Sequence, residues 1–182
     1  TLASLSDVEF EEDGSISIAL IGSDIDSNSL LYGISSNDNV STTLSGNILT
    51  INGGQDYSGQ LDLIASVTDG NLSATENLSI SITAVNDAPV LASVSNVSFD
   101  EDGSGSINLS GSDVDGDNLT YSIIGGSDIT AILDGSNISF IPLENYNGTE
   151  TFTVSVSDGE ETDSQSITVT VNAVNDAPVL SS

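Results

Sequence analysis

The sequence is similar to itself when it is shifted by 89 residues, so that Phe10 falls on Phe99, Asp24 on Asp113 and Asp87 on Asp176. A fixed internal period is the signature of tandem structural units, and the 182 residues therefore predict two domains. We expect repeat 1 to cover residues 1–88, repeat 2 to cover residues 89–177, and residues 178–182 to begin a following repeat. We therefore expect the chain to be a segment of a longer array of similar repeats.

Within each repeat, apolar residues alternate with Ser and Thr. Alternation with a period of two residues predicts half-buried strands, and turn signals such as Asp69-Gly70-Asn71 separate these segments. About seven short strands per repeat, without helical periodicity, predict an all-β chain of two seven-stranded antiparallel β-sandwiches in a linear array. The apolar faces expected in repeat 1 are Ile16, Ile18 and Leu20; Leu61, Leu63, Ala65 and Val67; and Leu78, Ile80 and Ile82.

The charge is one-sided: the chain has 28 Asp and Glu residues and no Lys, Arg or His, which gives a formal net charge of −28. Folded domains normally intersperse both signs of charge, so these acids need water or metal cations around them. The same charge repels nucleic acid and anionic lipid head groups, and no apolar run is long enough to cross a bilayer. We therefore expect a cation as the natural small partner, with no nucleic acid and no membrane insertion.

The composition also restricts the available chemistry. The chain contains no Cys and no His or Lys, so it can form neither a disulfide nor a zinc–thiolate site, and only carboxylates could catalyse a reaction. The same acids recur in both repeats, whereas a catalytic site is usually single and asymmetric. We therefore expect that the chain is not an enzyme.

Four motifs recur in both repeats: a Glu in the first turn, an Asp-x-Asp segment after the second strand, an Asp-Gly turn, and Asn-Asp-Ala-Pro at the end. In repeat 1 these motifs begin at Glu12, Asp24, Asp69 and Asn86. With this order and spacing, the sequence resembles the tandem cadherin-like repeats of large bacterial and archaeal surface proteins and adhesins. The resemblance covers both repeats almost end to end and implies Ig-like or cadherin-like β-sandwiches.

In cadherins, calcium lies between successive domains and is held by acids of the upstream domain, the linker and the downstream domain. The resemblance implies one complete site at the junction of the two repeats and a half-site at each end. The complete site would use Glu12, Asp56, Asn86, Asp87, Asp113, Asp115 and Asp158. One half-site would use Glu101, Glu144, Asn175 and Asp176, and the other Asp24, Asp26 and Asp69.

The chemistry of these residues favours calcium independently of the family. Ca²⁺ takes about six to eight oxygen ligands in flexible geometry, whereas Mg²⁺ requires a stricter octahedron and Zn²⁺ or Cu²⁺ prefers imidazole or thiolate. The linkers depart from the cadherin pattern at Ala84, Ala88, Ala173 and Ala177, so we expect one or two ions per junction rather than three. The alternative for each single acid is an ordinary turn residue, because Asp and Asn bond their own backbone.

Two further motifs in the sequence are less informative. Asp113-Val114-Asp115-Gly116-Asp117 is similar to the start of an EF-hand loop, but Asn118 and Ile124 stand where that loop needs Gly and Glu. Several Asn-x-Ser/Thr sequons also occur, and in a chain so rich in Ser and Thr their number alone does not indicate glycosylation. They include Asn39, Asn71, Asn77, Asn96, Asn118, Asn137 and Asn147.

The resemblance implies a function as well as a fold. We expect calcium-stiffened spacer repeats of an extracellular fibre or cell-surface adhesin, with Ca²⁺ bridging adjacent repeats. The expected partners are similar repeats joined head to tail, together with cell-surface glycans or like chains. The alternative is a carbohydrate-binding cadherin-like module of a secreted or surface protein, which an exposed row of aromatic residues would favour, although the chain has no Trp.

Overall fold

The computed structural model describes residues 1–26 and 29–178, and this part of the chain consists of strands and loops without helices. It divides into two compact units, unit 1 from Thr1 to Val85 and unit 2 from Asn86 onward. Residues 179–182, where we expect a further repeat to begin, lie outside the described residues.

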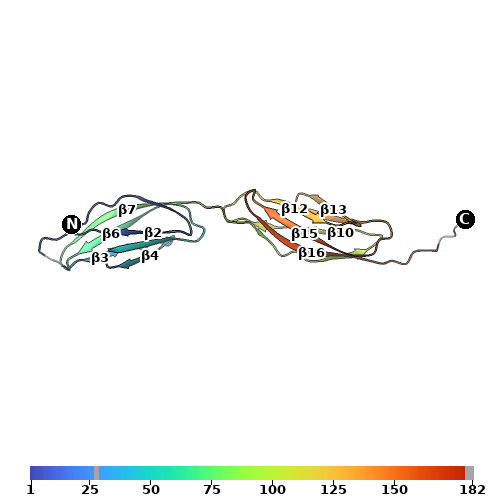
Figure 1. Ribbon diagram of the computed structural model, residues 1–182, viewed down its shortest axis with the longest axis horizontal. Coiled ribbons are helices and arrows are strands. Elements are labelled where there is room, and N and C mark those ends of the chain that lie inside the picture. The colour runs from blue at the N-terminus through green and yellow to red at the C-terminus, as the bar shows by residue number, and fades with distance from the viewer. Residues whose placement is uncertain (27–28, 179–182) are drawn as a thin grey trace. The chain divides into compact units, whose positions relative to one another are not determined.

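Unit 1 is a two-layered β-sandwich (Figure 1). One sheet has the strand order β1-β7-β6-β3 and the other the order β2-β5-β4. The seven strands are β1 (Val8–Glu11), β2 (Ser15–Ala19), β3 (Leu31–Ile34), β4 (Val40–Ser45), β5 (Ile48–Gly53), β6 (Gly59–Thr68) and β7 (Ser73–Thr83).

Unit 2 repeats this arrangement with sheets β12-β15-β16-β9 and β10-β14-β13, and it adds a short pair, β11-β8. In unit 1 the corresponding pair is a single bridge between Leu2 and Gly22. The strands are β8 (Val90–Leu91), β9 (Val97–Asp100), β10 (Gly105–Asn108), β11 (Gly111–Ser112), β12 (Thr120–Gly125), β13 (Ile129–Asp134), β14 (Asn137–Pro142), β15 (Gly148–Ser157) and β16 (Thr162–Asn172).

The all-β sandwich fold is confirmed, with one difference in strand pairing. The first long strand of each unit pairs with the last in parallel: Val8 lies opposite Ile80 in β1 and β7, and Val97 opposite Val169 in β9 and β16. The pairing is therefore mixed rather than purely antiparallel. Because these strands run in the same direction, the chain enters each unit at one end and leaves it at the other (Figure 1).

Each unit has its own hydrophobic core between its two sheets. The alternation predicted from the sequence holds, since Leu63 pairs with Leu78 across β6 and β7 and both side chains are buried. In unit 2, Phe140 of β14 and Phe152 of β15 are fully buried and meet edge to face, with ring centroids 5.2 Å apart. Such packing of large apolar side chains is the main source of stability in a sandwich of this size.

Candidate metal centre

The loop after β11 in unit 2 gathers three carboxylates. Asp113, Asp115 and Asp117 each offer one carboxylate oxygen, and these oxygens lie within 4.8 Å of one another. The loop is tightly turned because Asp113 Oδ1 accepts hydrogen bonds from the backbone N–H groups of Asp115, at 2.9 Å, and Asp117, at 3.3 Å. The Asp-x-Asp segment therefore converges, as a loop allows and a regular strand does not.

The second oxygen of Asp113 tests whether a cation fits this loop. Asp113 Oδ2 is buried, and within the described residues it accepts no hydrogen bond. A buried carboxylate oxygen without a donor costs about 1–3 kcal/mol or more. A cation bound beside Asp113 would remove this cost, so the donor set fits an oxygen-preferring metal ion.

Two linker residues at the start of unit 2 donate hydrogen bonds to acids of that unit, one of which lies in this loop. The backbone N–H of Asp87 donates to Asp115 Oδ2 at 2.9 Å, and the Asn86 side-chain amide donates to Asp158 Oδ2 at 2.9 Å. Carboxylate oxygens of Asp87 and Asp115 lie within 4.8 Å of each other. Unit 2 thus brings together five of the predicted site residues: Asn86, Asp87, Asp113, Asp115 and Asp158.

Asp158 is anchored through both of its oxygens. Besides the bond from Asn86, its Oδ1 accepts the N–H groups of Glu160 and Glu161, each at 2.7 Å. The Asn86 side chain, followed by these backbone donors, lowers the pKa of Asp158 below its ordinary value. Asp69, its counterpart in unit 1, also has a lowered pKa because its carboxylate accepts the N–H groups of Leu72 and Asn71. Both side chains are therefore ionised at neutral pH, as metal ligands must be.

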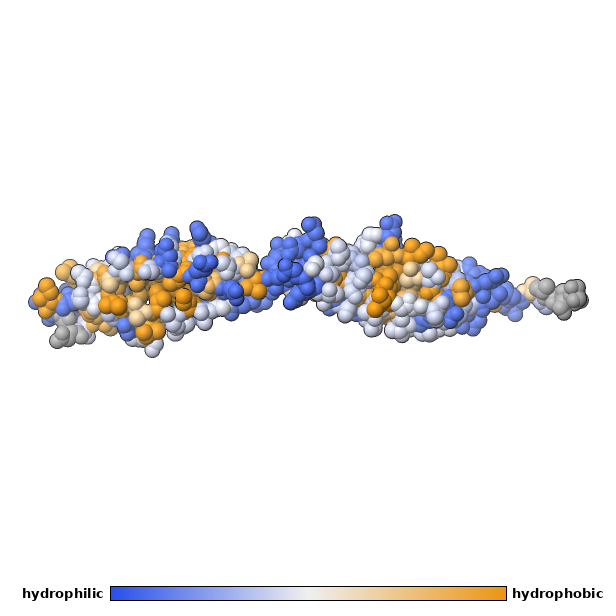
Figure 2. Space-filling view, turned by 45° about the horizontal axis from the view of Figure 1, so that its top comes forward, coloured by the Kyte–Doolittle hydropathy of each residue, from blue (hydrophilic) through white to orange (hydrophobic). Residues whose placement is uncertain are grey.

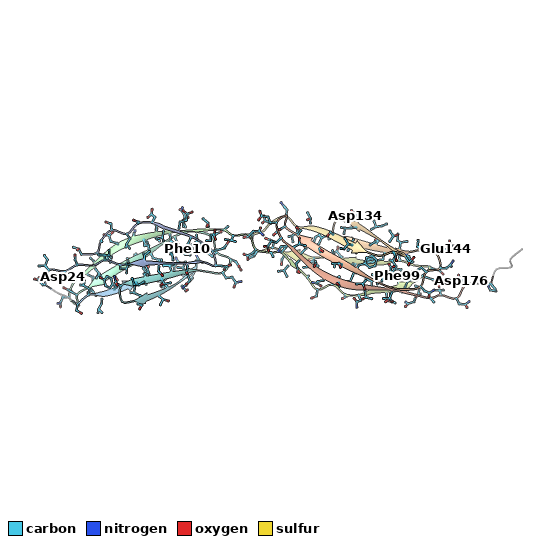
Figure 3. All side chains as sticks on the ribbon, viewed as in Figure 1. Phe10, Asp24, Phe99, Asp134, Glu144 and Asp176 are labelled. Carbon is cyan, nitrogen blue, oxygen red and sulfur yellow. The ribbon has the colours of Figure 1, made fainter. Side chains whose placement is uncertain are left out.

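The predicted half-site of unit 1 is formed in part. Asp26 N–H donates to Asp24 Oδ1 at 2.9 Å, which repeats the turn seen at Asp113. Asp24 and Asp69 line one pocket of about 170 Å³ together with Ser23. Asp24 lies at the end of unit 1 that carries the N terminus (Figure 3).

The buried glutamates of the two units have matching environments. Glu12 is 4% exposed and its Oε1 accepts the Val85 N–H at 2.7 Å, while Glu101 is 9% exposed and its Oε1 accepts the Val174 N–H at 2.6 Å. Each glutamate therefore holds the segment that follows the last strand of its unit. In unit 2, Glu101 Oε2 also accepts a hydrogen bond from the Asn147 side chain at 3.4 Å.

The remaining predicted ligands are less organised. Asp56 and Glu144 are exposed, and within the described residues neither takes part in a side-chain hydrogen bond or a cluster of three acids. Asn175 donates to the Asp176 carbonyl at 3.2 Å, as Asn86 does to the Asp87 carbonyl at 3.3 Å. Glu144 and Asp176 both lie at the end of unit 2 from which the chain leaves (Figure 3).

Asp117 is a further member of this cluster that the sequence motifs did not identify as a ligand. A third acid at alternate spacing after Asp113 and Asp115 is the signal that points to it. In unit 1 the corresponding residue is Asn28, which lies outside the described residues.

The aromatic residues do not form a binding platform. In the described residues, each of the four Phe and four Tyr side chains is buried or half-buried, and Phe10 and Phe99 pack against the cores of their units. On the face that Figure 2 shows, hydrophilic and hydrophobic residues are mixed in both units. A flat aromatic surface of the kind expected for polysaccharide binding is thus absent from the part of the chain that the structure describes.

Comparison with known proteins agrees with this fold. Residues 86–171, which lie in unit 2, match the family described as bacterial Ig domain. The EC1-2 fragment of human protocadherin-24 is 17% identical to the chain, with a TM-score of 0.57, and the match covers 94% of this chain and 95% of that one. The extracellular cadherin domains 1–5 of protocadherin gamma B2 are 19% identical, with a TM-score of 0.50, over 96% of this chain and 39% of that one.

Other matches are partial or absent. An endo-fucoidan hydrolase from glycoside hydrolase family 107 is 20% identical with a TM-score of 0.40, and the chain spans only 28% of that enzyme's length. A search of curated proteins finds no match. The described residues contain no helix with the length and hydropathy of a membrane span.

Proposed function

Because the chain consists of two tandem cadherin-like sandwiches, we propose that they are spacer repeats of an extracellular fibre or cell-surface adhesin, and that calcium bound at the linker stiffens the array. The observation that carries the proposal is the convergence of Asp87, Asp113, Asp115 and Asp117 in unit 2. These are four acids in a chain without a single basic side chain.

The proposed ligands are four acids of unit 2. Asp113 would bind through its buried Oδ2, while Asp87, Asp115 and Asp117 would supply further carboxylate oxygens. Asn86 and Asp158 hold each other through a hydrogen bond and so fix the start of the linker. Calcium supplies the positive charge that the protein lacks, and it draws the carboxylates together.

Unit 1 contributes to the proposed bridge through Glu12. Its carboxylate holds Val85, and the next two residues of the chain are Asn86 and Asp87. We propose that Glu12 shares the ion with the acids of unit 2, so that the linker loses its freedom when calcium binds. Extracellular calcium modules commonly have dissociation constants of about 10⁻⁴–10⁻³ M, and a ligand at a hundredfold excess over its dissociation constant stabilises a protein by about 2.7 kcal/mol.

Calcium binding and its effect on the linker can be measured on the same sample. Isothermal titration calorimetry should show one or two Ca²⁺ ions per chain, and small-angle X-ray scattering should show a longer particle with Ca²⁺ than with a chelator. Asp113→Asn combined with Asp115→Asn should abolish most of the binding, because these substitutions remove two anionic ligands. Asp134→Gln, at the exposed end of β13 (Figure 3), is the control and should bind calcium as the parent chain does.

The calorimetry and the scattering test calcium binding and linker stiffening separately. Equal calcium binding by the double variant and the control would show that the linker acids are not the ligands. Binding without any change in scattering would show that the ion does not stiffen the array.

A further inference from the structure

Half of the asparagines in this chain stand in Asn-x-Ser/Thr sequons. There are 16 Asn residues, eight of them in sequons, whereas Ser and Thr together make up 48 of the 182 residues, or about a quarter. Sequons are thus about twice as frequent as the Ser and Thr content alone gives. The eight are Asn39, Asn71, Asn77, Asn96, Asn108, Asn118, Asn137 and Asn147.

The structure separates these asparagines from the others by what their side-chain nitrogens do. All eight sequon asparagines are exposed, and within the described residues only Asn147 donates a hydrogen bond from its Nδ2, to Glu101. In contrast, five asparagines outside sequons donate from Nδ2 to the protein: Asn47, Asn52, Asn86, Asn172 and Asn175. Seven of the eight sequon asparagines thus leave Nδ2 without a protein acceptor among the described residues, whereas five of the seven described asparagines outside sequons use it in a hydrogen bond.

Two sequon asparagines are held in an orientation that exposes the nitrogen. Asn96 Oδ1 accepts the Thr168 N–H at 2.9 Å, and Asn108 Oδ1 accepts the Ser136 hydroxyl at 2.9 Å. Since the carbonyl oxygen of each amide is bonded to the protein, Nδ2 lies on the other side of the group. Attachment of a substituent to that nitrogen would leave these hydrogen bonds intact.

Three of the sequons lie at edge strands of their sheets, where a surface modification covers exposed backbone groups. Asn39 directly precedes β4, Asn96 directly precedes β9, and Asn108 ends β10, and all three strands are edges of their sheets. Exposed edges present unpaired backbone groups and invite pairing with other chains. None of the eight sequons falls on another at the 89-residue shift, in contrast to the acids, so the repeat fold itself does not require them.

We propose that seven of these asparagines carry N-linked glycans that are attached to the folded chain: Asn39, Asn71, Asn77, Asn96, Asn108, Asn118 and Asn137. The donor is a lipid-linked sugar with a phosphate leaving group on its anomeric carbon. Asn Nδ2 forms a bond to that carbon and loses a proton, while the bond between the carbon and the phosphate oxygen breaks and the lipid phosphate departs. Asn147 is excluded because its Nδ2 is bonded to the buried Glu101 carboxylate.

Glycopeptide mass spectrometry of the protein from its own organism tests this proposal. Proteases that cleave at Asp or Glu are needed, because the chain has no Lys or Arg for trypsin. Peptides with the seven asparagines should carry sugar mass on Asn, and peptides with Asn52, Asn172 or Asn147 should be unmodified. Ser73→Ala, expressed in the same organism, should remove the modification from Asn71, whereas Ser81→Ala on the same strand, outside any sequon, should not.

Each outcome decides between alternatives. Unmodified peptides at the seven positions overturn the proposal, and the sequons are then a product of Ser and Thr abundance. Modification of Asn147 to the same occupancy as the seven overturns attachment to the folded chain, because only the motif would then matter. Persistence of the modification at Asn71 in Ser73→Ala overturns N-linked transfer through the sequon.

Discussion

At the residue scale, backbone N–H groups replace the missing basic side chains as partners of the carboxylates. Glu150 is the fullest example, since its two oxygens accept the N–H groups of Ser127, Asp128 and Ile129 and the Ser127 hydroxyl, at 2.6–3.2 Å. Burial by itself raises the pKa of Glu150, but the hydrogen bonds from Ser127, Asp128 and Ile129 outweigh it and leave the pKa lowered. The ionised form therefore holds the loop between β12 and β13.

This bonding predicts an acid-sensitive contribution to the stability of unit 2. Because the pKa of Glu150 in the folded state lies below its ordinary value of 4.5, the stabilisation is complete above that pH and is lost as the pH falls through the folded-state pKa. Glu150→Gln should lower the free energy of unfolding of unit 2 by about 1–3 kcal/mol at pH 7, because an NH₂ group then faces backbone donors. The difference from the parent chain should shrink as the pH falls below 4.5.

Urea denaturation at a series of pH values measures this effect. Glu161→Gln is the matched control, since Glu161 is exposed in the same unit and its loss removes the same charge. A Glu150→Gln variant as stable as Glu161→Gln at pH 7 would contradict the role of the hydrogen bonds.

At the element scale, two glycines of unit 2 have similar backbone angles but different surroundings. Gly126, between β12 and β13, has φ +83°, and a Cβ atom there would lie 2.7 Å from Phe152 ring carbons and against the Ile129 carbonyl. Gly135, between β13 and β14, has φ +61° and no neighbour within 4 Å of such an atom. Both turns require a backbone φ in the left-handed region, but only at Gly126 do neighbouring atoms also leave no room for a side chain.

Substitution of each glycine by alanine should separate these two requirements. Gly126→Ala should destabilise unit 2 by about 2–4 kcal/mol, because backbone strain and overpacking add together. Gly135→Ala should cost only about 1–2 kcal/mol, from the backbone alone. Chemical denaturation checks both values, and equal costs would show that the loop at Gly126 relaxes away from Phe152.

The elements themselves could be read from the sequence to different extents. Alternation of apolar residues predicted β6 and β7 and their buried faces, since a period of two fixes which side chains point inward. It could not predict the parallel pairing of β1 with β7, because alternation carries no information on the direction of a partner strand. It also missed how β8 is held, by the side chains of Asp163 and Gln165 bonded to the backbone of Leu91.

At the scale of the whole molecule, the net charge of −28 affects stability through self-repulsion. Salt screens this repulsion, and the screening length falls from about 30 Å at 0.01 M to about 10 Å at 0.1 M. NaCl should therefore raise the melting temperature of the calcium-free protein steadily through this range. CaCl₂ at about 1 mM should raise it further than NaCl of the same ionic strength, because a bound ion acts at short range.

Differential scanning calorimetry with matched ionic strengths checks this comparison. MgCl₂ is the control for divalent charge, since Mg²⁺ keeps its waters and accepts flexible carboxylate sites poorly. If CaCl₂, MgCl₂ and NaCl of equal ionic strength gave the same melting temperature, the effect would be general screening and not a site.

The candidate site was also predictable in part. The loop acids Asp113 and Asp115 and the linker residue Asp87 could be selected from repeated spacing, and the structure brings them together in unit 2. The buried Oδ2 of Asp113 could not be foreseen, because burial of one oxygen depends on how the loop packs after folding. For Asp56 and Glu144 the resemblance to cadherin-like repeats was the only ground for a role as metal ligands, and that role remains a prediction.

The parallel pairing of first and last strands has an evolutionary consequence. In each unit a glutamate near the start binds the backbone just after the last strand: Glu12 accepts the Val85 N–H, and Glu101 accepts the Val174 N–H. The chain enters and leaves each unit at opposite ends. A gene encoding such cassettes can gain or lose whole copies by unequal recombination without disturbing the interior of any survivor. Natural selection can then adjust the length of such a protein through the number of its repeats alone.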